Sequence, residues 1–158
     1  MNAHEFYDIV QFKNISGSLT IKNNNELELL VEPYELLNVI ILIKHLGFHH
    51  LSCISCIDWI DKNIFSVVYN CWSYEHTLRI FIKTDINRND PELTTISDLW
   101  PHAQVYEQEI HEMFGVRFNG NPELGPLFLY EWKDIPPLRK DFDSKEYSRR
   151  VYGIMGEE

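Results

Sequence analysis

Two cysteines three positions apart, Cys53 and Cys56, are the residues of this sequence that most resemble a metal-binding or thiol–disulfide site. Their surroundings, HHLSCISCIDWI, have the composition of a buried strand, in which residues i and i+3 point to opposite faces. A zinc site would also need a second pair of ligands, and Cys71 is the only other cysteine of the chain. The pattern favours a buried strand, and a CxxC-based redox protein stays open as an alternative.

Three glutamates, Glu107, Glu109 and Glu112, lie within a helix that the sequence predicts over residues 102–114. The first two could be considered as an acid–base pair. Side chains at i and i+2 of a helix do not face each other, however, so a shared proton is not expected. We interpret the glutamates as an acidic helix surface that faces solvent or a partner.

Other motifs that would bind a metal or a nucleotide are incomplete. His111-Glu112 begins an HExxH zinc motif, but residue 115 is Gly instead of His. The Glu-x-x-His of a carboxylate-bridged two-metal site fails because residue 108 is Gln. A GxxxxG spacing that starts at residue 115 is not followed by Lys-Ser/Thr, and the chain contains no GxGxxG. We therefore expect no catalytic residue, no cofactor and no metal site in this chain.

The segment after the predicted helix is rich in aromatic residues, Gly and Pro, without a period that would pack them on their own chain. We expect such a segment to bind a large partner. It includes the sequence PPLRKDF at residues 136–142, where two prolines favour an extended backbone. Extended, it would place Leu138 and Lys140 on one side and Arg139 and Asp141 on the other. We interpret this ribbon as a docking segment; a surface loop of the same chain is the alternative.

The elements that would position these residues follow from periodicity and turn residues. Polar and apolar residues alternate over 18–22 and 26–31, and Asn23-Asn24-Asn25 between them favours a hairpin turn. Further strands are predicted over the ranges 49–59, 64–74 and 76–84, and a polar loop over 85–92. Helices are predicted from Pro33 to about Gly47, from Thr94 or Thr95 for a short stretch, and over 102–114.

These elements predict an α+β fold with a mixed, largely antiparallel sheet, helices packed on one side, and a long extended C-terminal tail. Residues 1–115 would form the body domain and residues 116–158 the extended partner-binding tail. No internal repeat divides the chain further. Its 158 residues suffice for one hydrophobic core.

Composition excludes some classes of function. The net charge of −10 argues against a nucleic-acid-binding protein, which needs a basic face. The longest apolar run, residues 39–43, is far shorter than the roughly 18 residues that a membrane-spanning helix needs. The N-terminal sequence MNAHEFYD lacks the basic start and apolar centre of a signal peptide, which makes a cytosolic location the expectation.

The chain resembles the thirty-kilodalton subunit of respiratory complex I, the proton-pumping NADH:quinone oxidoreductase. That family carries Glu-Arg-Glu, then a hydrophobic-Tyr-Asp-Met-Phe-Gly-Ile run, Phe-x-Gly-His-Pro, and a late Pro-Leu-Arg-Lys-Asp. The counterparts here are EQE at 107–109, IHEMFGV at 110–116, FNGNP at 118–122 and PLRKD at 137–141. Asp58 fits the weaker N-terminal pattern of the family, and the order of elements agrees over nearly the whole chain.

The sequence departs from this pattern at three places. Gln108 replaces the family's Arg, Asn121 replaces its His, and Gly125-Pro126 stands where a pair of Arg is usual. The run Leu-Phe-Leu at 127–129, Trp132 and the double proline look more like the homologous subunit of membrane-bound, energy-converting [NiFe] hydrogenases. We favour this branch; the corresponding subunit of NADH-quinone oxidoreductase proper is the alternative.

In either branch, the resemblance implies a non-catalytic structural subunit in the peripheral arm of a membrane-bound, ferredoxin-linked or complex I-like electron-transfer complex. It implies packing against the large catalytic subunit and neighbouring iron–sulfur subunits, on the cytoplasmic face, with membrane association only through the complex. No nucleic acid is expected as a partner, and a free-standing binding module remains a further alternative. The residues expected to bind the partner are Glu107, Glu109, Phe114, Phe118, Pro122, Trp132, Pro137, Leu138, Arg139, Lys140, Asp141 and Phe142.

Overall fold

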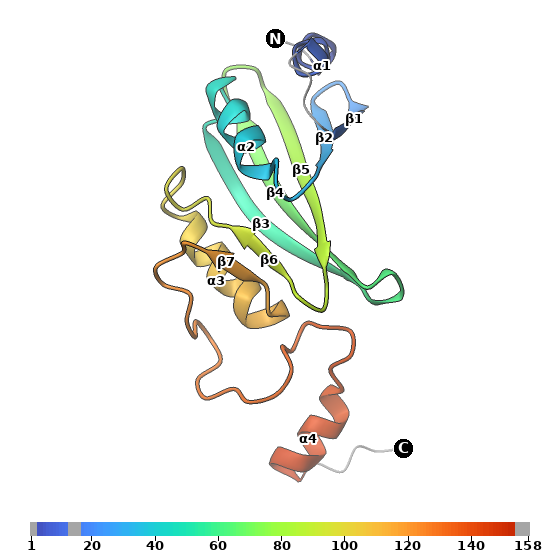
Figure 1. Cartoon of the computed structure of the whole chain (residues 1–158), viewed down its shortest axis with the longest axis vertical. Coiled ribbons are helices and arrows are strands. Elements are labelled where there is room, and N and C mark those ends of the chain that lie inside the picture. The colour runs from blue at the N-terminus through green and yellow to red at the C-terminus, as the bar shows by residue number, and fades with distance from the viewer. Residues whose placement is uncertain (1–2, 13–16, 154–158) are drawn as a thin grey trace.

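The computed structural model describes residues 3–12 and 17–153. Its elements follow the chain in the order α1 (Ala3–Phe12), β1 (Gly17–Asn23), β2 (Glu26–Val31), α2 (Leu36–His45), β3 (His50–Trp59), η1 (Ile60–Lys62), β4 (Ile64–Ser73), β5 (Leu78–Asn87), β6 (Glu92–Thr94), α3 (Ala103–Phe114), β7 (Arg117–Asn119) and α4 (Ser144–Tyr152). Figure 1 shows a long twisted sheet next to α2, with α3 and the tail gathered toward one end.

The main sheet has the strand order β1-β2-β5-β4-β3. All neighbouring pairs are antiparallel except β2 and β5, which are parallel. The hairpin predicted from the asparagine run is present, and the N–H of Asn25 bonds the side-chain oxygen of Asn23 at 2.9 Å. The predicted fold class, a mixed and largely antiparallel sheet with helices on one side, is confirmed.

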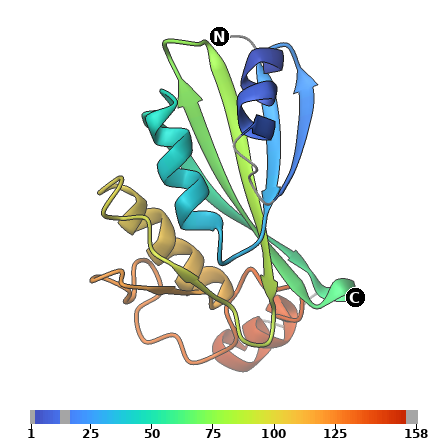
Figure 2. The same cartoon turned by 45° about the horizontal axis from the view of Figure 1, so that its top comes forward.

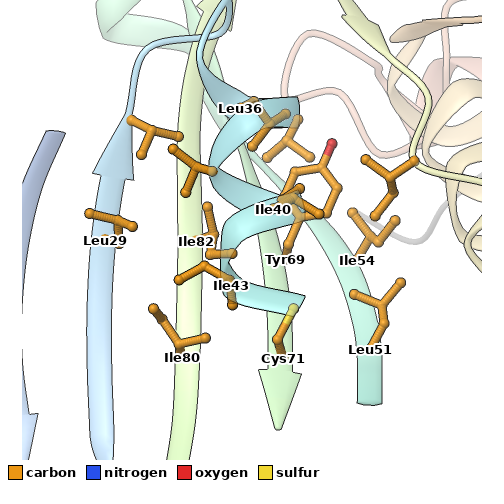
Figure 3. Packing of buried hydrophobic residues seen from close by; sticks show 14 of the residues in the cluster. Leu29, Leu36, Ile40, Ile43, Leu51, Ile54, Tyr69, Cys71, Ile80 and Ile82 are labelled. Atoms are coloured by element: carbon orange, nitrogen blue, oxygen red, sulfur yellow. The ribbon is translucent and has the colours of Figure 1, made fainter. Parts of the chain in front are cut away.

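The core lies between α2 and one face of the sheet. Leu36, Ile40 and Ile43 recur at helical spacing, so they share one face of α2, and each is at most 1% exposed. Figure 3 shows this face lying over apolar side chains of the strands, among them Leu29, Leu51, Ile54, Tyr69, Cys71, Ile80 and Ile82. Burial of each large aliphatic side chain contributes about 1.5–3 kcal/mol, which makes this interface the main source of stability.

The N-terminal helix α1 has no counterpart among the predicted elements. Its Phe6 is completely buried, and the ring lies 5.2 Å from that of Phe48 in an edge-to-face arrangement. Figure 2 shows α1 beside β1 and β2, at the opposite end of the sheet from the tail. The helix extends the core past α2, although its ten residues carry only a short apolar period.

The predicted start of α2 is wrong by three residues. Pro33 lies in a turn, and the helix begins at Leu36. The N–H of Glu35 bonds the carbonyl of Glu32 at 3.0 Å, and the N–H of Leu36 bonds that of Pro33 at 3.4 Å. These i→i+3 bonds form a tighter turn that leads into the helix.

Two predictions between β5 and α3 are also wrong. β5 continues to Asn87, three residues into the predicted polar loop, because Ile86 pairs with Phe65 and buries its side chain. The short helix predicted from Thr94 or Thr95 is replaced by β6, which pairs with β7, and by a turn. In that turn the hydroxyl of Thr95 accepts a hydrogen bond from the N–H of Ser97 at 3.1 Å.

The described tail is not extended throughout: it begins with the extended strand β7 but ends in the helix α4. Asp143 caps α4 by accepting hydrogen bonds from the N–H groups of Lys145 and Glu146 at 2.9 and 3.0 Å. Gly153 ends the helix in the left-handed region, at φ 64°. The sequence held a signal for this helix, since Asp143 and Glu146 have capping-box spacing.

Candidate partner-binding site

The cysteine pair does not form a site. In the register of β3 and β4, Cys53 aligns with Asn70 and Cys56 with the buried Val67, so the two thiols point to opposite faces of the sheet. Burial raises the pKa of Cys56 to about 12, which leaves its thiol protonated and poorly nucleophilic at neutral pH. Among the residues that the structure describes, no group of three or more His, Cys, Asp or Glu side chains could hold a metal ion.

Glu107 is buried instead of lying on the helix surface. Its carboxylate accepts hydrogen bonds from the Thr95 hydroxyl at 2.5 Å, the Ile96 N–H at 2.8 Å and the Asn121 side-chain amide at 2.8 Å. Burial raises the pKa of Glu107, and the three donors oppose that shift. The prediction of a solvent- or partner-facing position is wrong for Glu107, which joins α3 to the loop after β6 and to the tail; Glu109 is exposed.

Glu112 holds the middle of the tail against α3. Its carboxylate accepts hydrogen bonds from the backbone N–H groups of Leu127, Phe128 and Leu129 at 3.0, 2.9 and 2.7 Å. Partial burial acts to raise the pKa of Glu112, but the three N–H donors outweigh it and hold the pKa below its usual value. Three successive amides aimed at one carboxylate fix the position of this segment.

The places where the sequence departs from the family pattern contact one another or α3. The side-chain amide of Gln108 donates to the carbonyl of Gly125 at 3.1 Å. Asn121 donates to the carbonyl of Gln104 at 3.2 Å as well as to Glu107. Gln108 and Asn121 thus each hold part of the tail against α3.

A buried ion-pair network joins the end of the tail to the sheet. The guanidinium of Arg88 donates to both oxygens of Asp58, at 2.8 and 3.0 Å, and to Asp141 at 2.7 Å. The side chains of Arg88 and Asp58 are 7% and 2% exposed. The hydrogen bond from Arg88 is the main reason that the pKa of Asp141 falls to about 2. Burial acts to raise the pKa of Asp58, but Arg88 and the N–H of Lys140 outweigh it and the pKa is lowered.

The PPLRKDF ribbon folds onto its own chain in two successive turns, so its predicted extended form is wrong. The N–H of Arg139 bonds the carbonyl of Pro136 at 3.1 Å, and that of Phe142 bonds the carbonyl of Arg139 at 3.0 Å. The guanidinium of Arg139 lies over the ring of Phe65 at 5.5 Å and donates to Asp141. Leu138 and Lys140 are exposed, and Arg139 and Asp141 bond within the network.

The C-terminal end of α3 also lies close to the ribbon, at Met113 and Gly115. The N–H of Leu138 bonds the carbonyl of Met113 near the end of α3 at 3.0 Å. Gly115 ends α3 with φ 85°, and an added Cβ there would lie 3.3 Å from Pro136. The left-handed backbone favours glycine at residue 115, and a Cβ there would also press closely on Pro136 of the tail.

An aromatic cluster packs the tail against α4. The rings of Trp132 and Tyr147 lie 4.8 Å apart, and each lies 5.6 Å from the ring of Phe142. The side chain of Arg150 on α4 bonds Asp134 at 2.6 Å. Trp132 and Phe142, expected to bind a partner, are thus half-buried within the tail itself.

The exposed apolar residues of the tail form the candidate partner-binding surface. Phe128, Tyr130, Ile135 and Leu138 are 67%, 87%, 44% and 56% exposed, and we call these four residues the tail apolar surface. Of the residues expected to bind a partner, Glu107 and Phe118 are buried in this chain and are corrected, whereas Glu109, Pro122, Leu138, Lys140 and Asp141 are exposed. Phe114 and Pro137 are half-buried. Phe128, Tyr130 and Ile135 were not among the expected residues, because no period marks them.

Most of the sheet, together with α3 and most of the docked tail, matches one known protein family. The family model described as "Respiratory-chain NADH dehydrogenase, 30 Kd subunit" matches residues 29–148, which run from the second half of β2 through β7 to the network at Asp141. The chain belongs to this family. The resemblance drawn from the motifs is thereby confirmed.

Relatives in the family are subunits of respiratory oxidoreductase complexes. The chain is 34% identical over 103 residues to a subunit of the F420H2 dehydrogenase of Methanosarcina mazei, covering 62% of this chain and 63% of that protein. It is 30% identical over 120 residues to a subunit of the NADH-quinone oxidoreductase of Roseiflexus castenholzii, covering 73% and 69%. It spans only 15% of a much longer NADH-quinone oxidoreductase subunit of Acinetobacter baumannii, the C/D polypeptide, at 36% identity over 88 residues.

Solved structures share the fold. A chain of the membrane-bound sulfane sulfur reductase, an archaeal respiratory membrane complex, superimposes with a TM-score of 0.89 and 24% identity over 97% of this chain and 92% of that chain. The trypsin-resistant fragment of Nqo5 superimposes with a TM-score of 0.65 and 23% identity over 77% and 98%. In the described part of the present chain, no helix has the length and apolar character needed to cross a bilayer.

Proposed function

We propose that this chain is a non-catalytic subunit in the peripheral arm of a membrane-bound electron-transfer complex. In that role it packs against the large catalytic subunit and adjoins iron–sulfur subunits at the cytoplasmic face. Family membership supports the assignment, as do the names of relatives that are subunits of respiratory oxidoreductases. Electron transfer requires fixed distances between redox centres, and a rigid subunit that binds several neighbours would maintain them.

The observation that carries the proposal is the combination of an exposed apolar surface with a rigid backbone beneath it. Residues 127–129 are held by Glu112, and residues 138–141 by the network of Asp58 and Arg88. An apolar surface held in one conformation loses little entropy when a partner covers it. The tail apolar surface is therefore suited to a permanent interface, whose buried core is apolar.

Between the two branches, we propose the energy-converting hydrogenase type or a related ferredoxin-linked complex. The run at 127–129, Trp132 and the double proline support it, because all lie in the segment that forms the tail apolar surface or adjoins it. The corresponding subunit of NADH-quinone oxidoreductase proper is the second candidate, supported by relatives that carry this enzyme's name. The identity of the large subunit distinguishes the two, since a [NiFe] centre requires cysteine ligands in that subunit.

The test is purification of the intact complex from the organism that encodes this chain. The chain carries an affinity tag on the chromosome, membranes are solubilised in mild detergent, and co-eluting proteins are identified and quantified by mass spectrometry. We expect stoichiometric recovery of a large catalytic subunit together with iron–sulfur subunits. Elution of the chain alone as a monomer would contradict the proposal and support a free-standing binding module.

A further inference from the structure

A tryptophan at the end of β3 has a fixed orientation yet remains accessible. Trp59 is 40% exposed, and its indole N–H donates to the hydroxyl of Ser66 on β4 at 3.0 Å. That hydroxyl in turn donates to the carboxylate of Asp85 on β5. The chain of hydrogen bonds sets the plane of the ring from two neighbouring strands, so the exposed ring is a rigid platform.

Two lysines from distant parts of the sequence place their ammonium groups over this ring. The Nζ of Lys62 in η1 lies 5.2 Å from the ring centroid, and that of Lys140 in the tail lies 5.9 Å from it. Lys140 is brought there by its own backbone N–H, which donates to the buried carboxylate of Asp58 at 2.8 Å. Both cations gain from the negative face of the indole, which is the best aromatic partner for a cation.

Neither ammonium has a carboxylate partner in the part of the chain that the structure describes. Other lysines do: Lys22 and Lys83 share Glu28, at 3.2 and 2.8 Å. The chain has acidic residues to spare, since its net charge is −10 and Asp61 directly precedes Lys62, yet neither lysine is paired with any of those that the structure describes. Two exposed ammonium groups over one ring, neither in an ion pair with a described carboxylate, are available to pair with negative charges of a partner.

Two exposed apolar side chains lie close to Trp59 in the sequence. Ile57 and Ile60 are 39% and 40% exposed, close in sequence to Trp59 on β3 and η1. We call Ile57, Trp59, Ile60, Lys62 and Lys140 the Trp59 patch. A surface of this kind combines an aromatic anchor and aliphatic contacts with a site for one or two negative charges, which are features of interaction hot spots.

We propose that the Trp59 patch binds an acidic segment of another subunit, with Asp or Glu side chains paired to Lys62 and Lys140 and apolar neighbours against the isoleucines. The partner rests on the proposed function, since the segment would belong to the complex. A polyanionic nucleic acid or an anionic bilayer fits less well, because the rest of a −10 chain would repel an extended negative surface. The structure thus assigns partner contact to Lys140, while Arg139 acts within the chain by bonding Asp141.

Carbodiimide cross-linking of the purified native complex tests this chemistry directly. The reagent activates a carboxylate, and a lysine amine in contact with it displaces the resulting urea to form an amide. We expect Lys62, Lys140 or both to be joined to an Asp or Glu of a co-purified subunit in the mass spectra. Cross-links from other lysines with none from these two would overturn the proposal, as would links that join two copies of this chain.

A charge-reversal variant, Lys62→Glu with Lys140→Glu, provides the second measurement. We expect about a tenfold lower recovery of partner subunits per tagged chain, which is the effect of losing two exposed ion pairs. Lys62→Arg with Lys140→Arg should restore recovery, because Arg keeps the charge and the aromatic contact. Lys145→Glu with Arg149→Glu changes the net charge equally at exposed positions of α4 and should assemble normally.

The outcomes separate this proposal from the proposed function. Normal recovery of the Glu variant from a complex that does purify would overturn the Trp59 patch and leave the structural-subunit role standing. A wild-type chain that elutes alone would overturn both. If the Glu variant misfolds, the cross-links of the wild type and the recovery of the Arg variant still decide the proposal.

Discussion

Arg88 bonds two carboxylates, those of Asp58 and Asp141, so substituting it measures how much the ion-pair network contributes to the stability of the fold. In Arg88→Met, the buried Asp58 keeps its charge but loses its partner, and we expect a loss of about 3–5 kcal/mol in the free energy of unfolding. Urea denaturation measures it. Adding Asp58→Asn to that variant should recover part of the loss, since the buried charge is then gone; equal stability of wild type and Arg88→Met would contradict the network.

The carboxyl of Asp141 makes the stabilising effect of this network depend on pH. Its pKa is about 2 in the folded chain, against about 3.9 for an unperturbed Asp. A lowered folded pKa means that the contribution is present above about pH 4 and lost as the pH falls toward 2. We therefore expect the stability difference between wild type and Asp141→Asn to narrow over that interval, measured by thermal unfolding between pH 2 and 6. A constant difference would show that Asp141 is not paired.

Glu107 should give the pH dependence of stability the opposite sign. Its pKa is raised by burial, so its contribution is present below the unfolded pKa of about 4.3 and declines as the pH rises through the folded value. Glu107→Gln also presents an N–H₂ group to three donors, which should lower stability by about 1–3 kcal/mol. We expect that deficit to shrink with rising pH in chemical denaturation experiments; Glu109→Gln, exposed two residues away, is the matched control.

At the scale of elements, Glu112 determines whether the middle of the tail is ordered. In Glu112→Ala the N–H groups of residues 127–129 lose their common acceptor, and we expect their hydrogen exchange to accelerate by about tenfold or more. Exchange of α3 and the sheet should stay unchanged, and Glu109→Ala serves as control. Unchanged protection of residues 127–129 would mean that neighbouring contacts, not the carboxylate, hold the segment.

The elements predicted well from the sequence are those in which the spacing of apolar residues within the element itself indicates a strand or a helix. The alternation in β5 placed Leu78, Ile80 and Ile82 in the core, and α3 differs from its prediction by one residue. Glu107 was misplaced although a signal existed, since it lies four residues after Ala103 and three before Ile110, both buried. A charged residue on an apolar face is buried only when donors reach it, and Thr95 and Asn121 come from other elements.

The candidate site was less predictable because its contacts are distant in sequence. Arg88 lies 30 positions from Asp58 and 53 from Asp141, and nothing near it indicates an ion pair. The turns of the ribbon likewise depend on Met113 and Asp58, which bond its N–H groups from the body. Composition correctly marked the tail as unusual, but its position on the body comes from these tertiary contacts.

For the whole molecule, the tail apolar surface should control assembly. Phe128→Ser with Tyr130→Ser removes two exposed rings and should weaken binding of the large subunit by about 2 kcal/mol or more if they are buried at the interface. Tyr34→Ser with Tyr74→Ser alters rings that are 73% and 75% exposed on the body and is the matched control. The measurement is the amount of large subunit recovered per tagged chain.

If both double variants assemble equally well, the partner binds elsewhere on the molecule. If only the tail variant fails while its circular dichroism and unfolding midpoint match the wild type, the defect belongs to the interface. This comparison separates loss of contact from loss of folding, because neither pair of rings belongs to the core.

The parallel pairing of β2 with β5 has a consequence for how the chain folds. β2 ends at Val31 and β5 begins at Leu78, so the ribosome delivers the first hairpin 47 residues before its neighbouring strand starts to emerge. A two-stranded hairpin is at best marginally stable alone, and its apolar side chains at Leu27 and Leu29 stay uncovered meanwhile. Closing so long a loop is slow, so the meander of β3, β4 and β5 forms first and the hairpin joins it last. A nascent chain stalled before Leu78 would thus be a substrate for chaperones.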